Sequence, residues 1–190
     1  MIRFALALAL FISPAFADDT AAPAHQLTST EQRADALDEL FYRLRKADRP
    51  EEAQKAESQI WKLWMESDSP TAEVLLQQAT VAMGASAPGP ALKILNELIA
   101  AKPDLAEAWN KRATLYFMLG RYEDSIADIA KTLELEPRHF GALAGLGMIL
   151  RNQGKNNEAL KAFKDALAIN PRMPGALGAV KELEEKSRGI

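Results

Sequence analysis

Cysteine is absent from this chain of 190 residues. Its absence excludes disulfide bonds, thiolate catalysis, thiolate metal sites and a lipid-modified cysteine anchor, so any folded domain must be stabilised by packing alone. Aromatic residues are also scarce, at 7%, although 48% of the residues are hydrophobic. Because alanine and leucine make up much of that fraction, the composition favours helices around a real core.

Clusters of one charge and catalytic motifs are missing too. Lys and Arg number 23 against 26 Asp and Glu, with no basic run, so nucleic acid is not expected as a partner. Neither His25 nor His139 has a second ligand at helical spacing. Asp124 and Asp128 lie four residues apart, and we interpret them as a solvated helix face rather than an acid–base pair. We therefore expect no enzyme, no metal and no cofactor.

The first residues have the order of a secretory signal peptide. The stretch "MIRFALALALFISPAFADDT" has a charge at Arg3, an apolar run and then a small-x-small exit. The apolar run is too short to span the roughly 30 Å of a membrane core. We predict a signal peptide over 1–17, cleavage after Ala17 and a flexible leader over 18–30. The mature protein is then expected in a bacterial periplasm, without a stable membrane anchor.

A repeat of 34 residues follows. The segments 72–105, 106–139 and 140–173 align without gaps. Prolines, small residues and apolar residues recur in register: Pro103, Pro137 and Pro171; Ala79, Ala113 and Gly147; Ala91, Ser125 and Ala159; Leu75, Trp109 and Leu143; Leu95, Ile129 and Phe163. Repeats of this length are typical of stacked helical hairpins.

The small residues explain a glycine-rich stretch, "RHFGALAGLGMILRNQGK". Two antiparallel helices approach closely only where a side chain is small, which accounts for Gly147 and Ala159. Gly154 suits the left-handed residue that ends a helix, and Pro171 stops the helix after it. The stretch lacks the glycine spacing and the preceding strand of a dinucleotide loop, so we interpret its glycines as packing and capping residues.

These features resemble the tetratricopeptide repeat family, in a secreted bacterial form. The central copy matches best, through Trp109, Tyr116, Gly120, Tyr122 and Pro137. It departs from the family where Arg112 replaces leucine and where Ser125 and Thr132 replace alanine. The resemblance implies an all-α fold, a right-handed superhelical α-solenoid of helix-turn-helix hairpins.

The flanking segments extend this prediction. Residues 31–71 are interpreted as a divergent first hairpin, four residues longer than the 34-residue unit if it begins at Ala34. Residues 174–190 carry an apolar stripe and a charged face, which predicts a capping helix, because a stack of repeats otherwise ends on an exposed apolar face. We expect four hairpins and a cap in one curved stack.

The resemblance also implies a partner-binding groove. In the family, the first helix of each hairpin lines a concave face that holds an extended peptide or a helix of another protein. Carried onto this chain, the groove residues are Leu76, Thr80, Met83, Asn110, Thr114, Phe117, Ala144, Met148, Arg151 and Asn152. Chaperone-binding members clamp a terminal carboxylate with lysine at these helices. No lysine stands at the corresponding positions, so a clamp of that kind is not expected.

Two functions remain open. One is a non-catalytic periplasmic adaptor or assembly factor that holds a partner protein in the groove. The other is a structural repeat protein of the cell envelope that associates with itself through the region of Trp61 and Trp64. The oligomeric state distinguishes the two.

Overall fold

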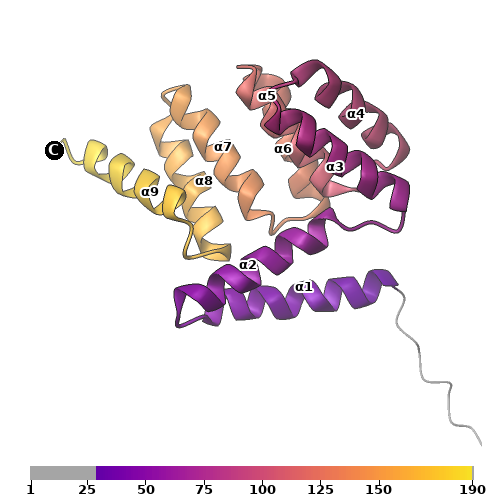
Figure 1. Ribbon diagram of the computed structural model, residues 1–190. Helices are drawn as coiled ribbons and strands as arrows, with labels where there is room; N and C mark the ends of the chain where they lie inside the picture. Colours follow the sequence, from indigo (N-terminus) through magenta and orange to yellow (C-terminus); the bar gives the residue numbers. More distant parts are fainter. Residues whose placement is uncertain (1–28, 190) are drawn as a thin grey trace, which may run out of the picture.

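The computed structural model describes residues 29–189, and all regular structure in this range is α-helical (Figure 1). In chain order the helices are α1 (Ser29–Lys46), α2 (Pro50–Met65), α3 (Pro70–Gly84), α4 (Pro88–Ala101), α5 (Ala106–Met118), α6 (Tyr122–Leu135), α7 (Phe140–Asn152), α8 (Asn156–Ile169) and α9 (Pro174–Ser187). The predicted signal peptide and most of the predicted leader lie outside the described residues.

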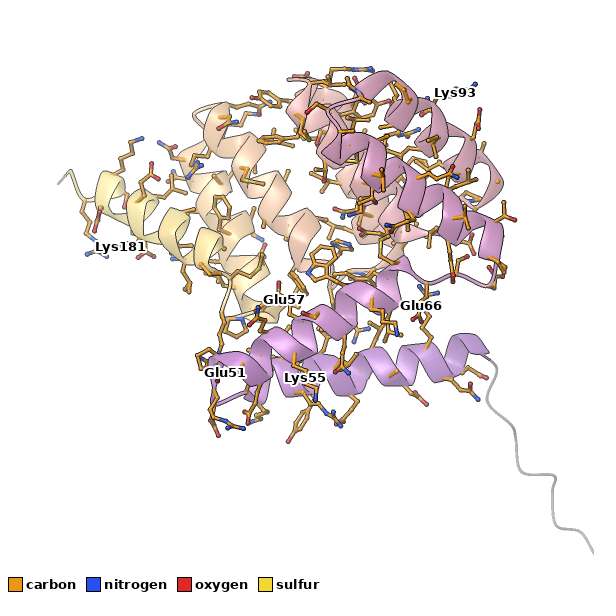
Figure 2. All side chains as sticks on the ribbon, in the orientation of Figure 1. Glu51, Lys55, Glu57, Glu66, Lys93 and Lys181 are labelled. Atoms are coloured by element: carbon orange, nitrogen blue, oxygen red, sulfur yellow. The ribbon has the colours of Figure 1, made fainter. Side chains whose placement is uncertain are left out.

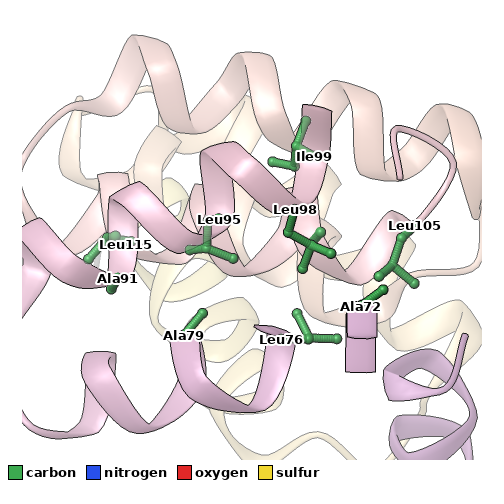
Figure 3. Packing of buried hydrophobic residues seen from close by; sticks show 10 residues of the cluster. Ala72, Leu76, Ala79, Ala91, Leu95, Leu98, Ile99, Leu105 and Leu115 are labelled. Carbon is green, nitrogen blue, oxygen red and sulfur yellow. The ribbon is translucent and has the colours of Figure 1, made fainter. Parts of the chain in front are cut away.

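The three repeats form three antiparallel hairpins, α3–α4, α5–α6 and α7–α8, and each hairpin packs against the next. Gly120 and Gly154 have positive φ angles of 70° and 74°, so they supply the left-handed residue after the first helix of two hairpins. The all-α solenoid predicted from the sequence is confirmed. The hairpin interiors are filled by alanine and leucine, as Figure 3 shows for Leu76 and Ala79 of α3 against Leu95 of α4.

Small residues do set the distance between paired helices. A Cβ atom added to Gly147 would lie 2.8 Å from the Phe163 ring, closer than real Cβ contacts. Ala159, in the facing helix, is fully buried. The aromatic ring of α8 therefore fills the space that a side chain on α7 would need.

The α1–α2 hairpin departs from the predicted stack. It lies across the turns between repeats, beside the start of α7 and the α8–α9 turn (Figure 1). It does not stack against α3 as a preceding repeat would. Its core includes Phe140, the first residue of α7, with Ile169 and Met173 packed nearby. The rings of Trp61 and Trp64 pack against His139 and Phe140 at the start of α7, and these contacts hold α2 beside that turn.

Two arginines that are 34 residues apart fix this position. Arg138 forms an ion pair with Asp38 of α1 and lies over the Phe41 ring, 4.4 Å from its centroid. Arg172 donates to the carbonyl oxygens of Ala47 and Asp48, at 2.7 and 3.0 Å, just after α1 ends. Equivalent residues of successive repeat turns therefore bind the middle of α1 and the chain just after its C-terminal end.

The α1–α2 hairpin also contacts the α8–α9 turn. Asn170 of that turn donates to Glu57 of α2 at 3.1 Å, and Figure 2 shows Glu57 on the side of α2 that faces the turn. At the far end of the chain α9 packs against α8, in the place of the next repeat's first helix. The predicted capping helix is confirmed as α9, which buries its own Leu183.

Candidate partner-binding groove

The first helices of the repeats, α3, α5 and α7, carry the residues predicted to line the groove. Thr114, Asn152 and Met148 are exposed, and Thr80, Met83, Phe117, Ala144 and Arg151 are partly exposed. The prediction that Leu76 lines the groove is wrong. Leu76 is fully buried in the core between α3 and α4, so it cannot contact a partner. Asn110 is buried as well, at 8% exposure, because its amide serves an internal contact described below.

A cleft opens between α5 and α7 on this face. Its volume is about 70 Å³, and Asn110, Thr114, Phe117 and Met148 lie along it. The floor is open because Gly141 and Gly145 of α7 contribute no side chains. A cleft of this kind accepts one apolar side chain and has the Thr114 hydroxyl at its edge. The structure therefore brings four of the predicted groove residues together.

The polar end of the groove is already engaged within the chain. Arg151 pairs with Glu182 of α9 at 3.3 Å, and both side chains are partly exposed. Asn152 donates to the hydroxyl of Tyr122 at 3.2 Å, and the Tyr122 ring lies 5.8 Å from the Phe117 ring. Arg151 is thus already paired within the chain, and this ion pair weakens its attraction for a ligand carboxylate.

The α1–α2 hairpin closes the other end. A Cβ added to Gly141 would lie 2.7 Å from the Trp61 ring, so Trp61 covers the start of α7 beside the cleft. Trp64 stacks on His139 with ring centroids 4.0 Å apart and is 4% exposed. The expectation that these tryptophans form an exposed self-association surface is therefore corrected, because both rings pack against the repeats.

A buried polar cluster lies under Trp64. His139 Nδ1 accepts a hydrogen bond from the backbone N–H of Ala142 at 3.1 Å, which caps α7. The ring proton therefore lies on Nε2, which faces Glu107 Oε2 at 3.0 Å. Asn110 donates to the same carboxylate oxygen at 2.9 Å. Sequence reasoning gave His139 no metal-ligand role and missed its contact with Glu107, whose acidic side chain at the start of a repeat was the available signal.

Arg112 and Asp128 form a second internal pair. Two hydrogen bonds of 2.7 and 2.8 Å join the guanidinium to the carboxylate, and Arg112 also reaches Asn96 of the preceding hairpin at 2.8 Å. The hydrogen bonds that Arg112 donates to Asp128 raise the pKa of the guanidinium above its ordinary value. Asp128 is buried, so the predicted solvated face is corrected for this residue. The substitution of Arg112 for the family's leucine explains why a carboxylate fits there.

Among residues 29–189, no group of three or more histidine, cysteine, aspartate and glutamate side chains is placed to hold a metal ion. Within the same range, no helix is both long enough and apolar enough to cross a membrane. The predicted groove residues that stay accessible carry apolar, hydroxyl and amide groups and one guanidinium, which can make apolar contacts and hydrogen bonds.

Comparison with known proteins identifies the family. A TPR repeat-containing protein of Rhizobium etli is 38% identical over 189 residues, covering 100% of this chain and 93% of the relative. This chain belongs to the tetratricopeptide repeat family. A profile of the tetratricopeptide repeat also matches residues 104–172, the second and third repeats. The family resemblance inferred from the repeat register is thus confirmed.

Solved structures show the same fold. The first TPR domain of Spaghetti (RPAP3), bound to the HSP90 peptide SRMEEVD, superposes with a TM-score of 0.60 at 20% identity, covering 64% of this chain and 96% of that one. The crystal structure of MamA protein gives a TM-score of 0.56 at 20% identity, with 82% of each chain covered. Both comparisons support a tetratricopeptide superhelix here.

Proposed function

We propose that this chain is an exported, non-catalytic protein-interaction module, which holds a peptide or helix of a partner against α3, α5 and α7. The observation that carries this proposal is the cleft between α5 and α7, where exposed Met148 and partly exposed Phe117 lie beside the Thr114 hydroxyl. Met148 is exposed, and Phe117 keeps part of its ring accessible although it also packs beside the core of α5, α6 and α7. An adaptable thioether and an aromatic ring are suited to a partner's apolar side chain.

The partner is expected to differ from a chaperone terminus. The RPAP3 domain that resembles this chain was solved with an acidic HSP90 peptide. Here the predicted groove positions hold no lysine, and Arg151 is paired with Glu182. We therefore propose a partner that enters the cleft with an apolar side chain and hydrogen-bonds through its backbone. Periplasmic export is proposed from the signal-like sequence 1–17.

A photo-crosslinking amino acid placed at Thr114 or Met148 tests the groove in living cells. Both sites are exposed and border the cleft. Lys161, exposed on α8, is the matched control site. The proposal expects the same covalent adduct from both groove sites and none from position 161. Adducts from position 161 alone would place the partner on the second helices instead.

The energetic test replaces Phe117 by alanine, once the adduct has been identified by mass spectrometry. Central aromatic contacts typically carry about 2 kcal/mol or more, so the partner's Kd should rise roughly thirtyfold. Arg151→Ala should weaken binding less, because Glu182 already engages that side chain. Unchanged affinity in the Phe117 variant contradicts the groove. Export is tested separately: an intact mass beginning at Asp18 supports cleavage, and retention of Met1 contradicts it.

A further inference from the structure

The outward face of α3 has no partner within the described residues. Val74 and Val81 are 55% and 61% exposed. The equivalent residues of every later unit, at steps of 34, are buried to 3% exposure or less: Ala108, Ala142 and Ala176 for Val74, and Leu115, Ile149 and Leu183 for Val81. In those units the preceding hairpin packs against these two positions. On α3 it stays open because α1–α2 lies across the repeat turns instead.

This face also lacks charge. The exposed residues of α3 are all uncharged: Pro70, Thr71, Val74, Gln77, Gln78, Val81 and Gly84. The one charged residue of the helix, Glu73, is partly buried and accepts a hydrogen bond from the Ser67 backbone at 2.8 Å. End units of repeat proteins normally present a polar outer surface, and loss of charge marks the centre of an interface. The α3 face is therefore built like a covered surface.

The opposite end of the stack obeys the normal rule. Exposed residues of α9 include Lys181, Glu182, Glu185 and Lys186. Figure 2 shows Lys181 pointing outward from that end, while α3 and α4 form the other end. Seating α9 of one copy on α3 of another would bury charged groups without partners, which is costly. Head-to-tail association of copies is therefore disfavoured.

The pattern on α3 is symmetric about its own middle. Val74 and Val81 lie seven residues apart, about two helical turns, on either side of Gln77 and Gln78. A second α3 laid antiparallel about that midpoint places Val74 of one copy against Val81 of the other. The glutamine amides then meet at the centre, and each amide can both donate and accept. A surface that complements itself in this way suits a two-fold interface.

We propose that this protein forms a two-fold homodimer in which α3 packs antiparallel against α3 of a second copy. The contact is one helix face wide, so the dimer is weak; interfaces below about 1,200 Å² are typical of transient complexes. The dimer uses the end of the stack and leaves the cleft between α5 and α7 accessible. It also differs from association through Trp61 and Trp64, whose rings pack against His139 and Phe140 of the same chain.

Sedimentation equilibrium of the purified protein from about 1 μM to about 1 mM tests the dimer at concentrations suited to a small interface. Val81→Lys should raise the dimer Kd at least about tenfold, because it places an unpaired charge in the contact. Leu177→Lys on α9, where the native side chain is 48% exposed, is the matched control and should leave the Kd unchanged. A monomer at all concentrations overturns the proposal, and so does an equal effect of the two variants.

A mixing experiment tests the antiparallel register. Val74→Glu and Val81→Lys should each form weak dimers alone, yet their mixture should dimerise at least as well as the native chain, because the opposite charges face each other. A mixture of Val74→Glu with Val74→Lys should not recover. Recovery of that second mixture alone indicates a parallel pair and overturns the arrangement proposed here. Failure of both mixtures to recover overturns it as well.

Discussion

The α1–α2 hairpin and the three regular hairpins are built alike, as two antiparallel helices, but they attach to the rest of the chain differently. The regular hairpins meet through alanine, leucine and isoleucine at positions that recur every 34 residues. The first hairpin attaches through Trp61 and Trp64 and through the arginines Arg138 and Arg172. Apolar contacts that recur make a stack, whereas a few large and charged contacts allow a hairpin to turn across it.

The largest expected effect comes from removing the aromatic attachment. Trp64→Ala should destabilise the protein by about 3–5 kcal/mol, because it deletes a buried ring stacked on His139. Urea unfolding measures the loss, and hydrogen exchange should show α1 and α2 opening first. Tyr42→Ala, at an exposed position of α1, is the control and should change stability by about 0.5 kcal/mol or less. Equal effects of the two changes would mean that the hairpin is not held by Trp64.

The second effect concerns the pair inside the regular repeats. Asp128→Asn should cost about 1.5–3 kcal/mol, since it weakens two charge-assisted hydrogen bonds to Arg112. Asp124→Asn is the matched control, because Asp124 is exposed and pairs with Arg121 at the surface. Its cost should stay below about 1 kcal/mol. Chemical denaturation compares them, and a larger loss from the Asp124 change would contradict the internal role of Asp128.

The sequence predicted the regular repeats because their contacts repeat. Proline, glycine and small residues at a fixed interval indicate where each helix ends and where two helices touch, so the helical hairpins and the packing role of Gly147 could be predicted from the sequence alone. The position of the α1–α2 hairpin could not be predicted from the sequence. Its attachment joins residues about 100 positions apart, such as Asp38 and Arg138, and leaves no period in the chain. Both arginines follow the repeat prolines, a signal that is clear only once the structure is known.

The groove was predicted in part for the same reason. Family positions indicated Thr114, Phe117 and Met148, which line the cleft. They also indicated Leu76 and Asn110, whose side chains turn inward here. Leu76 is apolar and fills the α3–α4 hairpin, and Asn110 donates a hydrogen bond to the buried carboxylate of Glu107. A position in a repeat fixes the direction of a side chain only when the neighbouring contacts match the family.

A third effect tests close packing between α7 and α8. Gly147→Leu should destabilise by roughly 1–3 kcal/mol, because the added side chain collides with the Phe163 ring. Ala159→Leu, on the facing helix, should cost a similar amount for the same reason. Lys161→Leu, at an exposed position of α8, should change stability by about 0.5 kcal/mol or less. Identical urea midpoints for the three variants would refute the close approach.

The smallest expected effect concerns an ion pair between the loop that follows the α1–α2 hairpin and the first regular repeat. Lys102, just after α4, contacts Asp68 in the α2–α3 loop at 2.7 Å. This hydrogen bond and the positive charge lower the pKa of Asp68 from its ordinary 3.8. A carboxylate whose pKa is lowered by folding stabilises the folded state fully at pH values above its ordinary pKa. This contribution is lost as the pH falls through the lowered pKa.

Asp68→Asn should therefore be slightly less stable than the native chain at neutral pH, and this gap should close as the pH falls below about 3.8. Because Asp68 is exposed, salt should close the same gap at neutral pH by screening the ion pair. Lys93→Gln, an exposed cation of α4 outside this contact, is the control and should show no such pH dependence. Urea midpoints at several pH values measure the gap. If it stays constant with pH and with salt, the Asp68–Lys102 contact is not formed in solution, and the aromatic rings and the two arginines alone hold the first hairpin.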